Sequence, residues 1–229
     1  MAKQRQTKQP TDEGLVGAVG NSGQSVNDFF EEHKQTITYL LGGLFVVVIG
    51  FLIYRQFVQI PRAKEAAEQI AQAQMQFERD SFALALTNPG QGYPGFVDIA
   101  EDYSGTETGN LALYYAGISY LNLGQYEAAI DYLEDYNPSG SILPTMKAGA
   151  LGDAYSEMND FDKALSLYKK AAKSDNDYLA SYYLKKYGML SERQGNTGDA
   201  QKAYQRIKTE YFDTPAAGDI DKYLARVGG

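Results

Sequence analysis

The side chains that most often carry out covalent or metal chemistry are nearly absent from this sequence. The chain of 229 residues has no Cys and a single His, His33. It therefore has no disulfide framework, no Cys-based zinc site, no thiol nucleophile and no His-centred triad. Neighbouring carboxylates such as Asp160 and Asp162 lie beside a predicted turn, where they favour a helix N-terminus more readily than acid–base chemistry. We expect no catalytic residue, no metal ligand and no cofactor.

A glycine-rich loop at residues 88–95 matches the spacing of dinucleotide-binding loops, with Gly90, Gly92 and Gly95 in a G-x-G-x-x-G pattern. That chemistry needs a strand before the loop and a helix after it. Here a helical pattern precedes the loop, and Pro94 removes one of the backbone donors that would bind phosphate. We expect a turn between two antiparallel helices instead.

Charge is unevenly distributed along the chain. The net charge of −8 argues against a nucleic-acid partner, because phosphate-backbone binding needs a basic surface. Nine acids lie from Asp80 to Asp135, and no Lys or Arg lies between Arg79 and Lys147. This acidic half would steer a basic partner towards the domain. The alternative is that these acids form a solvated face that keeps the domain soluble.

Residues 35–55 are predicted to form a transmembrane helix. Between Lys34 and Arg55 lie 20 residues without a charge. As a helix they extend roughly 30 Å, the thickness of a bilayer core. Tyr39 and Tyr54 lie near the two ends, where aromatic rings favour the membrane interface. The segment begins too late for a secretory signal and no cleavage site follows it, so we expect an uncleaved anchor in a lipid bilayer.

Two segments precede this anchor. Residues 1–24 have few large apolar side chains and are predicted to be disordered. Residues 25–34 are predicted to form a juxtamembrane amphipathic turn, with Val26, Phe29 and Phe30 as candidate partner contacts. The alternative is that these residues extend the transmembrane helix.

Flanking charge does not orient the anchor clearly. The basic residues before it are Lys3, Arg5, Lys8 and Lys34, and those after it are Arg55, Arg62 and Lys64. A tail of about 35 residues can be crossed or retained, so local charge decides little.

Residues 61–229 carry an internal repeat that predicts an all-α fold. Gly117, Gly152 and Gly188 are 35 and 36 residues apart, and each has an Ala twelve residues later. Small residues at these places let two helices approach closely, and the turn residues Gly124, Asn159 and Gly195 tolerate positive φ. The pattern resembles the tetratricopeptide repeat, a pair of antiparallel helices. We expect repeats at 110–143, 145–178 and 181–214, a degenerate unit at 62–103 and a capping helix at 215–227.

Within the degenerate unit, an apolar stripe from Ala63 to Leu84 predicts one helix over residues 62–86. A second, shorter helix is expected over residues 94–103.

In tetratricopeptide repeats the first helices of the pairs line a groove for an extended peptide or protein segment. The positions here that correspond to this groove are Tyr114, Ile118, Leu121, Asp153, Ser156, Glu157, Tyr182, Lys185, Met189 and Glu192. The alternative is that several of them pack under neighbouring helices. Chaperone-tail receptors of this class clamp a carboxylate with Lys, Asn and Arg, whereas this chain has Tyr114 and Ile118 at the corresponding first-unit positions. The clamp is therefore absent.

The order of parts resembles the ancillary subunit of the SecYEG translocon (the YfgM-type family). Phe29 and Phe30, a single anchor, a long Ala/Gln-rich helix and then repeats carry this resemblance. It implies a single-pass protein of the bacterial inner membrane, with a cytoplasmic N-terminus and periplasmic repeats. It also implies two partners, SecYEG and a membrane-anchored periplasmic prolyl isomerase-like chaperone, and no catalytic residues. The alternatives are an anchored scaffold of another cell-envelope complex, for secretion or division, and a cytosol-facing chaperone or import receptor.

Overall fold

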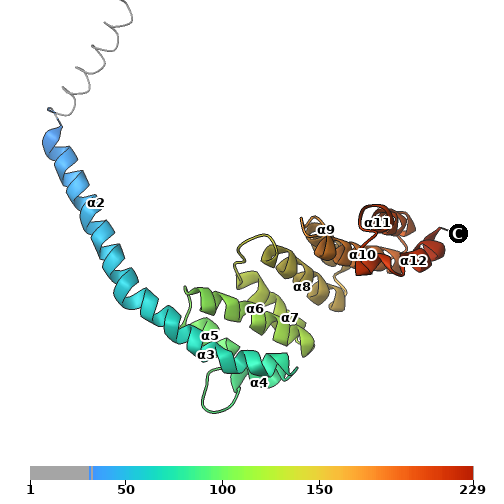
Figure 1. Cartoon of the computed structure of the whole chain (residues 1–229), viewed down its shortest axis with the longest axis horizontal. Coiled ribbons are helices and arrows are strands. Elements are labelled where there is room, and N and C mark those ends of the chain that lie inside the picture. Colours follow the sequence, from blue (N-terminus) through green and yellow to red (C-terminus); the bar gives the residue numbers. More distant parts are fainter. Residues whose placement is uncertain (1–30, 32, 229) are drawn as a thin grey trace, which may run out of the picture. The chain divides into compact units, whose positions relative to one another are not determined.

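The computed structural model describes residue 31 and residues 33–228, and every regular element among them is a helix (Figure 1). The all-α prediction is therefore confirmed for this part of the chain. The predicted tail 1–24 and the candidate contacts Val26, Phe29 and Phe30 lie outside the described residues. The chain divides into two units between Val58 and Gln59.

The described part of the first unit is dominated by the apolar helix α2 (Lys34–Tyr54). None of its residues is buried by other parts of the protein, and large side chains such as Leu44 and Phe45 are at least 60% exposed. A helix that is apolar on all sides needs an apolar environment. By length and composition, this helix can cross a membrane. It ends one residue before the predicted boundary, because a π-helical turn (Arg55–Gln59) begins at Arg55.

The second unit begins with three helices rather than the predicted two: α3 (Ile60–Glu78), α4 (Phe82–Thr87) and α5 (Phe96–Asp102). The prediction of one helix over 62–86 is wrong. The backbone turns at Asp80, whose φ is +56°, and the N–H of Asp80 donates to the carbonyl of Phe77. This turn changes the face that α4 presents, so Leu84 is 48% exposed instead of continuing the stripe.

Aromatic rings fill the space between these first helices and the repeats. Phe77 meets Tyr115 edge-on with ring centres 5.0 Å apart, and Phe96 stacks on Tyr115 at 4.9 Å. The glycine-rich loop joins α4 to α5, so a helix precedes it, as predicted. Its Gly95 fits against the Leu86 carbonyl, where an added Cβ would lie 2.1 Å from the oxygen. The end of the loop at Gly95 therefore packs closely against α4.

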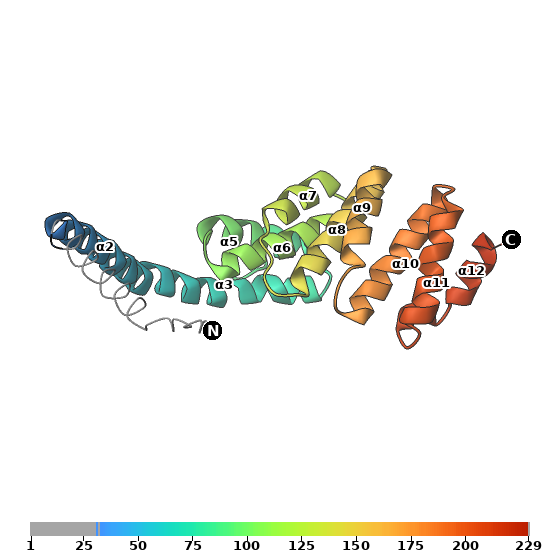
Figure 2. The same ribbon diagram turned by 90° about the horizontal axis from the view of Figure 1, so that it is seen from above.

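Three helix pairs follow one another, as Figure 2 shows. Their bounds are α6 (Glu107–Asn122) with α7 (Tyr126–Asp135), α8 (Leu143–Glu157) with α9 (Phe161–Ala171), and α10 (Asp177–Arg193) with α11 (Thr197–Glu210). Each first helix begins before the predicted repeat start. For α6 and α10 the reason is a side-chain cap, because Thr106 accepts from the N–H of Gly109 and Asn176 accepts from the N–H of Leu179.

The C-terminal end is not the single helix predicted over 215–227. A 3₁₀ turn (Pro215–Ala217) comes first, and α12 (Ile220–Val227) begins after Gly218 and Asp219. Ile220 is buried in the core formed by α9, α10 and α11, so α12 covers the end of the helix stack.

The repeat glycines are contact points within the helix pairs. An added Cβ would lie 2.6 Å from Leu133 at Gly117, 2.7 Å from Tyr168 at Gly152 and 2.5 Å from Tyr204 at Gly188. The predicted close approach of the two helices is therefore confirmed.

The turns within the pairs follow the prediction as well. The φ angles of the three turn residues are +73° at Gly124, +62° at Asn159 and +78° at Gly195. Such angles favour Gly and Asn over other residues.

We predict that Gly117→Ala lowers the melting temperature of the full-length protein, measured by circular dichroism in a mild detergent. The new methyl group must displace the fully buried Leu133, at a cost of about 1–3 kcal/mol. Gly198→Ala is the matched control, since nothing lies within 4 Å of a Cβ at that helical position. An equal loss of stability in both variants would contradict the packing role of Gly117.

Candidate protein-binding groove

The first helices of the pairs bring seven of the ten predicted groove residues together around two adjoining cavities. The larger, the central groove, has a volume of about 640 Å³ and is lined by Leu121, Asn122, Tyr126, Asp153, Ser156, Glu157, Tyr168, Lys186, Met189, Leu190 and Arg193. The smaller, the apolar pocket, has a volume of about 360 Å³ and is lined by Tyr178, Tyr182, Lys185, Lys186, Met189, Pro215 and Ala216. Lys186 and Met189 belong to both, so the two cavities adjoin each other.

An ion pair and a tyrosine side chain that is hydrogen-bonded to it form the floor of the central groove. The Lys186 ammonium lies 2.7 and 2.8 Å from the two carboxylate oxygens of Asp153, and the Tyr168 hydroxyl donates to Asp153 at 2.7 Å. Burial acts to lower the pKa of Lys186, but the Asp153 carboxylate outweighs it, so the pKa is raised. Burial, together with Asp153, raises the pKa of Tyr168. The floor is therefore polar, fixed in position and compensated in charge.

The apolar pocket is lined by exposed rings and alkyl groups. Tyr178 is 58% exposed, and Tyr182 and Met189 are each 44% exposed. The two lysines beside them have acidic partners already, since Lys185 pairs with Asp219 and Lys186 with Asp153. Their stems can therefore line the pocket without a free charge at its base.

Four polar side chains lie along the rim of the central groove. Glu157 and Arg193 are exposed and make no ion pair within residues 33–228. The Arg193 guanidinium lies 5.3 Å from the centre of the Phe161 ring, which helps to hold it in place. Ser156 adds a hydroxyl, and Asn122 adds an amide whose Nδ2 also donates to the Ile118 carbonyl at 2.8 Å. These groups can bind the backbone of an extended segment.

Three predicted residues lie outside both cavities. Tyr114 packs against Tyr136 with ring centres 5.2 Å apart, and burial raises its pKa to about 12. Ile118 packs on the core between α7 and α8. Glu192 accepts from Tyr204 at 2.8 Å and binds Arg226 at 2.8 Å. These three side chains are therefore engaged by neighbouring parts of the protein and do not line the cavities.

Other residues that line the two cavities were not predicted from the sequence. Lys186 and Arg193 lie four residues after Tyr182 and Met189, on the same face of α10. Extending each predicted position by one helical turn would have found them. Pro215 and Ala216 gave no comparable signal, because the 3₁₀ turn reaches α10 only through the tertiary fold.

We predict that Asp153→Asn destabilises the full-length protein by ~1–3 kcal/mol, because it leaves the Lys186 ammonium, only 28% exposed, without its counter-charge. Thermal unfolding in mild detergent measures the loss. Adding Lys186→Met to Asp153→Asn should recover part of the stability, since the uncompensated charge is then removed. A double variant that is less stable than Asp153→Asn alone would contradict this account of the groove floor.

Comparison with family sequence models identifies tetratricopeptide repeats at two places, residues 111–137 and residues 150–218. Comparison with curated proteins finds no match. The first match covers most of α6 and the whole of α7, and the second covers the second half of α8 and the whole of α9, α10 and α11. Tetratricopeptide domains act as protein-interaction scaffolds and are typically non-catalytic. The described part of the chain is accordingly all-helical and carries tetratricopeptide repeats after a helix that, by length and composition, can span a membrane.

Proposed function

We propose that this chain is a single-pass protein of a bacterial inner membrane that binds segments of exported proteins beside the Sec translocon. In this proposal α2 anchors the chain, the N-terminus is cytoplasmic and the repeats are periplasmic. The observation that carries it is the pair of adjoining cavities on the first helices of a tetratricopeptide domain that follows a membrane-competent helix. We choose the Sec translocon as the partner complex because the order of segments in this chain resembles that of the ancillary translocon subunit.

The two cavities would bind different parts of an extended segment. The apolar pocket would take one apolar side chain, whose burial contributes about 1.5–3 kcal/mol. Glu157, Arg193, Ser156 and Asn122 would bind the amides and carbonyls of the segment. Because backbone groups are common to all sequences, such a groove would accept many different segments with modest affinity. This suits a protein that handles newly exported chains.

Anchoring would compensate for modest affinity. A binding site tethered to a membrane meets segments emerging nearby at an effective concentration of up to about millimolar. We propose that the predicted juxtamembrane residues Val26, Phe29 and Phe30 contact the translocon, and that a membrane-anchored periplasmic prolyl isomerase-like chaperone joins the assembly. No catalytic step is proposed for the chain itself.

Two other roles rest on the same groove. One is an anchored scaffold of another cell-envelope complex, for secretion or division. The other is a cytosol-facing chaperone or import receptor. Tyr114 and Ile118 weigh against the second, because a carboxylate clamp needs cationic and amide side chains at those positions. Partner identity separates the first alternative from our proposal, and topology separates the second.

The test is purification of the tagged full-length protein in mild detergent, followed by mass spectrometry of the proteins that accompany it. We predict stoichiometric SecY, SecE and SecG, the periplasmic chaperone and a mixture of exported proteins. Met189→Glu places a charge in both cavities and should remove the exported proteins while leaving the translocon subunits. Met158→Glu is the matched control, because Met158 is similarly exposed, at 39%, and lines neither cavity.

Enrichment of a different envelope complex, without translocon subunits, would contradict the proposed machine. Loss of exported proteins from both methionine variants would contradict the proposed groove.

A further inference from the structure

A second concave surface, which we name the basic crevice, lies between α9 and α11 across α10. Its volume is about 370 Å³, and it is lined by Lys169, Ala172, Lys173, Leu184, Tyr187, Asp199, Lys202, Ala203 and Arg206. None of these residues lines the central groove or the apolar pocket. The crevice is therefore a separate surface of the repeat domain.

The geometry of α10 explains the separation. With 3.6 residues per turn, Leu184 and Tyr187 lie on the opposite side of the helix from Tyr182, Lys186 and Met189. One side of α10 therefore faces the apolar pocket and the other faces the basic crevice. A ligand in one cavity leaves the other open.

The crevice has an apolar floor and a cationic rim. Leu184, Ala172 and Ala203 form a buried floor with exposures of 7%, 3% and 3%, and the half-buried Tyr187 ring adds to it. Four cations and one acid, Asp199, line the rim. Such a surface is complementary to a segment that carries both an apolar side chain and carboxylates.

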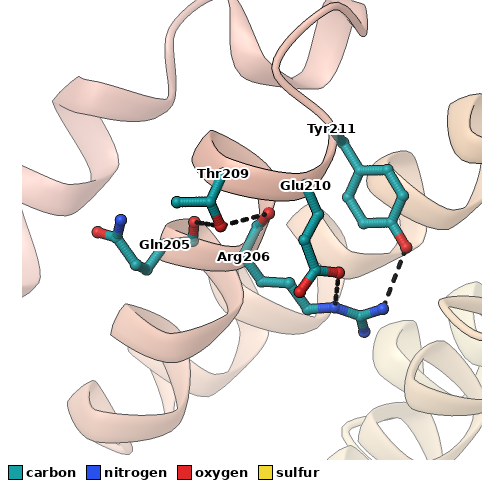
Figure 3. Close-up of polar contacts among 5 residues, drawn as sticks. All are labelled: Gln205, Arg206, Thr209, Glu210 and Tyr211. Atoms are coloured by element: carbon teal, nitrogen blue, oxygen red, sulfur yellow. Dashed lines mark hydrogen bonds and ion pairs between the residues drawn. The ribbon is translucent and has the colours of Figure 1, made fainter.

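The rim cations differ in how far their charge is compensated. Figure 3 shows Arg206 held by its neighbours: its Nε lies 2.6 Å from a Glu210 carboxylate oxygen, and its Nη2 donates to the Tyr211 hydroxyl at 3.1 Å. Lys202 lies 3.7 Å from Asp199, and both are well exposed, so this pair is weak.

Lys169 and Lys173 are exposed and make no ion pair within the described part of the chain. They are therefore the two rim charges most available to a ligand.

We propose that the basic crevice binds an acidic segment of a partner protein, with one apolar side chain on the floor and carboxylates beside Lys169 and Lys173. A bilayer surface fits less well, because the apolar floor lies below the rim and the acids Asp199 and Glu210 would repel anionic headgroups. Binding here leaves the groove on the opposite side of α10 free. The domain can therefore hold an acidic partner and an extended client segment at the same time, which goes beyond the proposed function.

The test uses the full-length protein in nanodiscs of neutral phosphatidylcholine. The probe is a fluorescent peptide of about twelve residues, rich in Glu and Asp around one Phe, and binding is read by fluorescence anisotropy. Two matched peptides replace the acids by Gln and Asn, or the Phe by Ser. The protein variant is Lys169→Gln/Lys173→Gln. Its control, Lys64→Gln/Lys222→Gln, changes the net charge equally at exposed sites outside the crevice.

We expect the acidic Phe peptide to bind at least about tenfold more tightly than either matched peptide. The crevice variant should lose this preference, the control variant should keep it, and salt raised from about 0.05 to about 0.5 M should weaken it. Met189→Glu should leave it unchanged, so this result does not depend on the proposed groove.

Three outcomes would overturn the proposal. One is equal affinity for all three peptides, and another is an equal loss in both lysine variants. The third is binding to phosphatidylglycerol vesicles, or to a second copy of the chain, that depends on Lys169 and Lys173 while the peptides are not distinguished.

Discussion

The contact of a bare glycine backbone with a large side chain of the paired helix is the constraint on which the repeat domain depends. Leu133, Tyr168 and Tyr204 occupy the space that a side chain at Gly117, Gly152 or Gly188 would need. This contact sets how closely the helices of a pair pack, and it also places the groove. In α8 and α10 the residue after the glycine is rotated by about 100° around the helix, away from the contact. Those residues are Asp153 and Met189, and both line the central groove.

Two of these large side chains also connect the packing to the polar surface. The Tyr168 ring fills the space at Gly152 while its hydroxyl donates to Asp153, which in turn holds Lys186. The Tyr204 ring fills the space at Gly188 while its hydroxyl donates to Glu192. At α8 and α9, the groove floor is therefore fixed by the same tyrosine that fixes the helix pair. In our proposal, this fixed and charge-compensated floor lets the groove bind different segments through its rim and its apolar pocket without reorganising for each.

Features that depend on local spacing were predictable from the sequence. The membrane-competent helix, the repeat glycines and the three positive-φ turn residues each follow from residue type and periodicity within about one helix pair. Features that depend on distant partners were not. Glu192 was assigned to the groove, but it binds Arg226, 34 residues later. The helix predicted over 62–86 breaks at Asp80, a turn that the apolar stripe does not reveal. The apolar pocket needs Pro215 and Ala216, which reach α10 only through the fold.

In our proposal, other proteins bind at the cavities on the first helices of the repeats. Site-specific photo-crosslinking of the full-length protein in membrane vesicles tests it most directly, with benzoylphenylalanine replacing Tyr182 in the apolar pocket. The matched position is Tyr93, a tyrosine of similar exposure in the loop between α4 and α5, outside both cavities. We predict crosslinks to other proteins from position 182 and few from position 93. Equal crosslinking from both positions, or none from position 182, would contradict it.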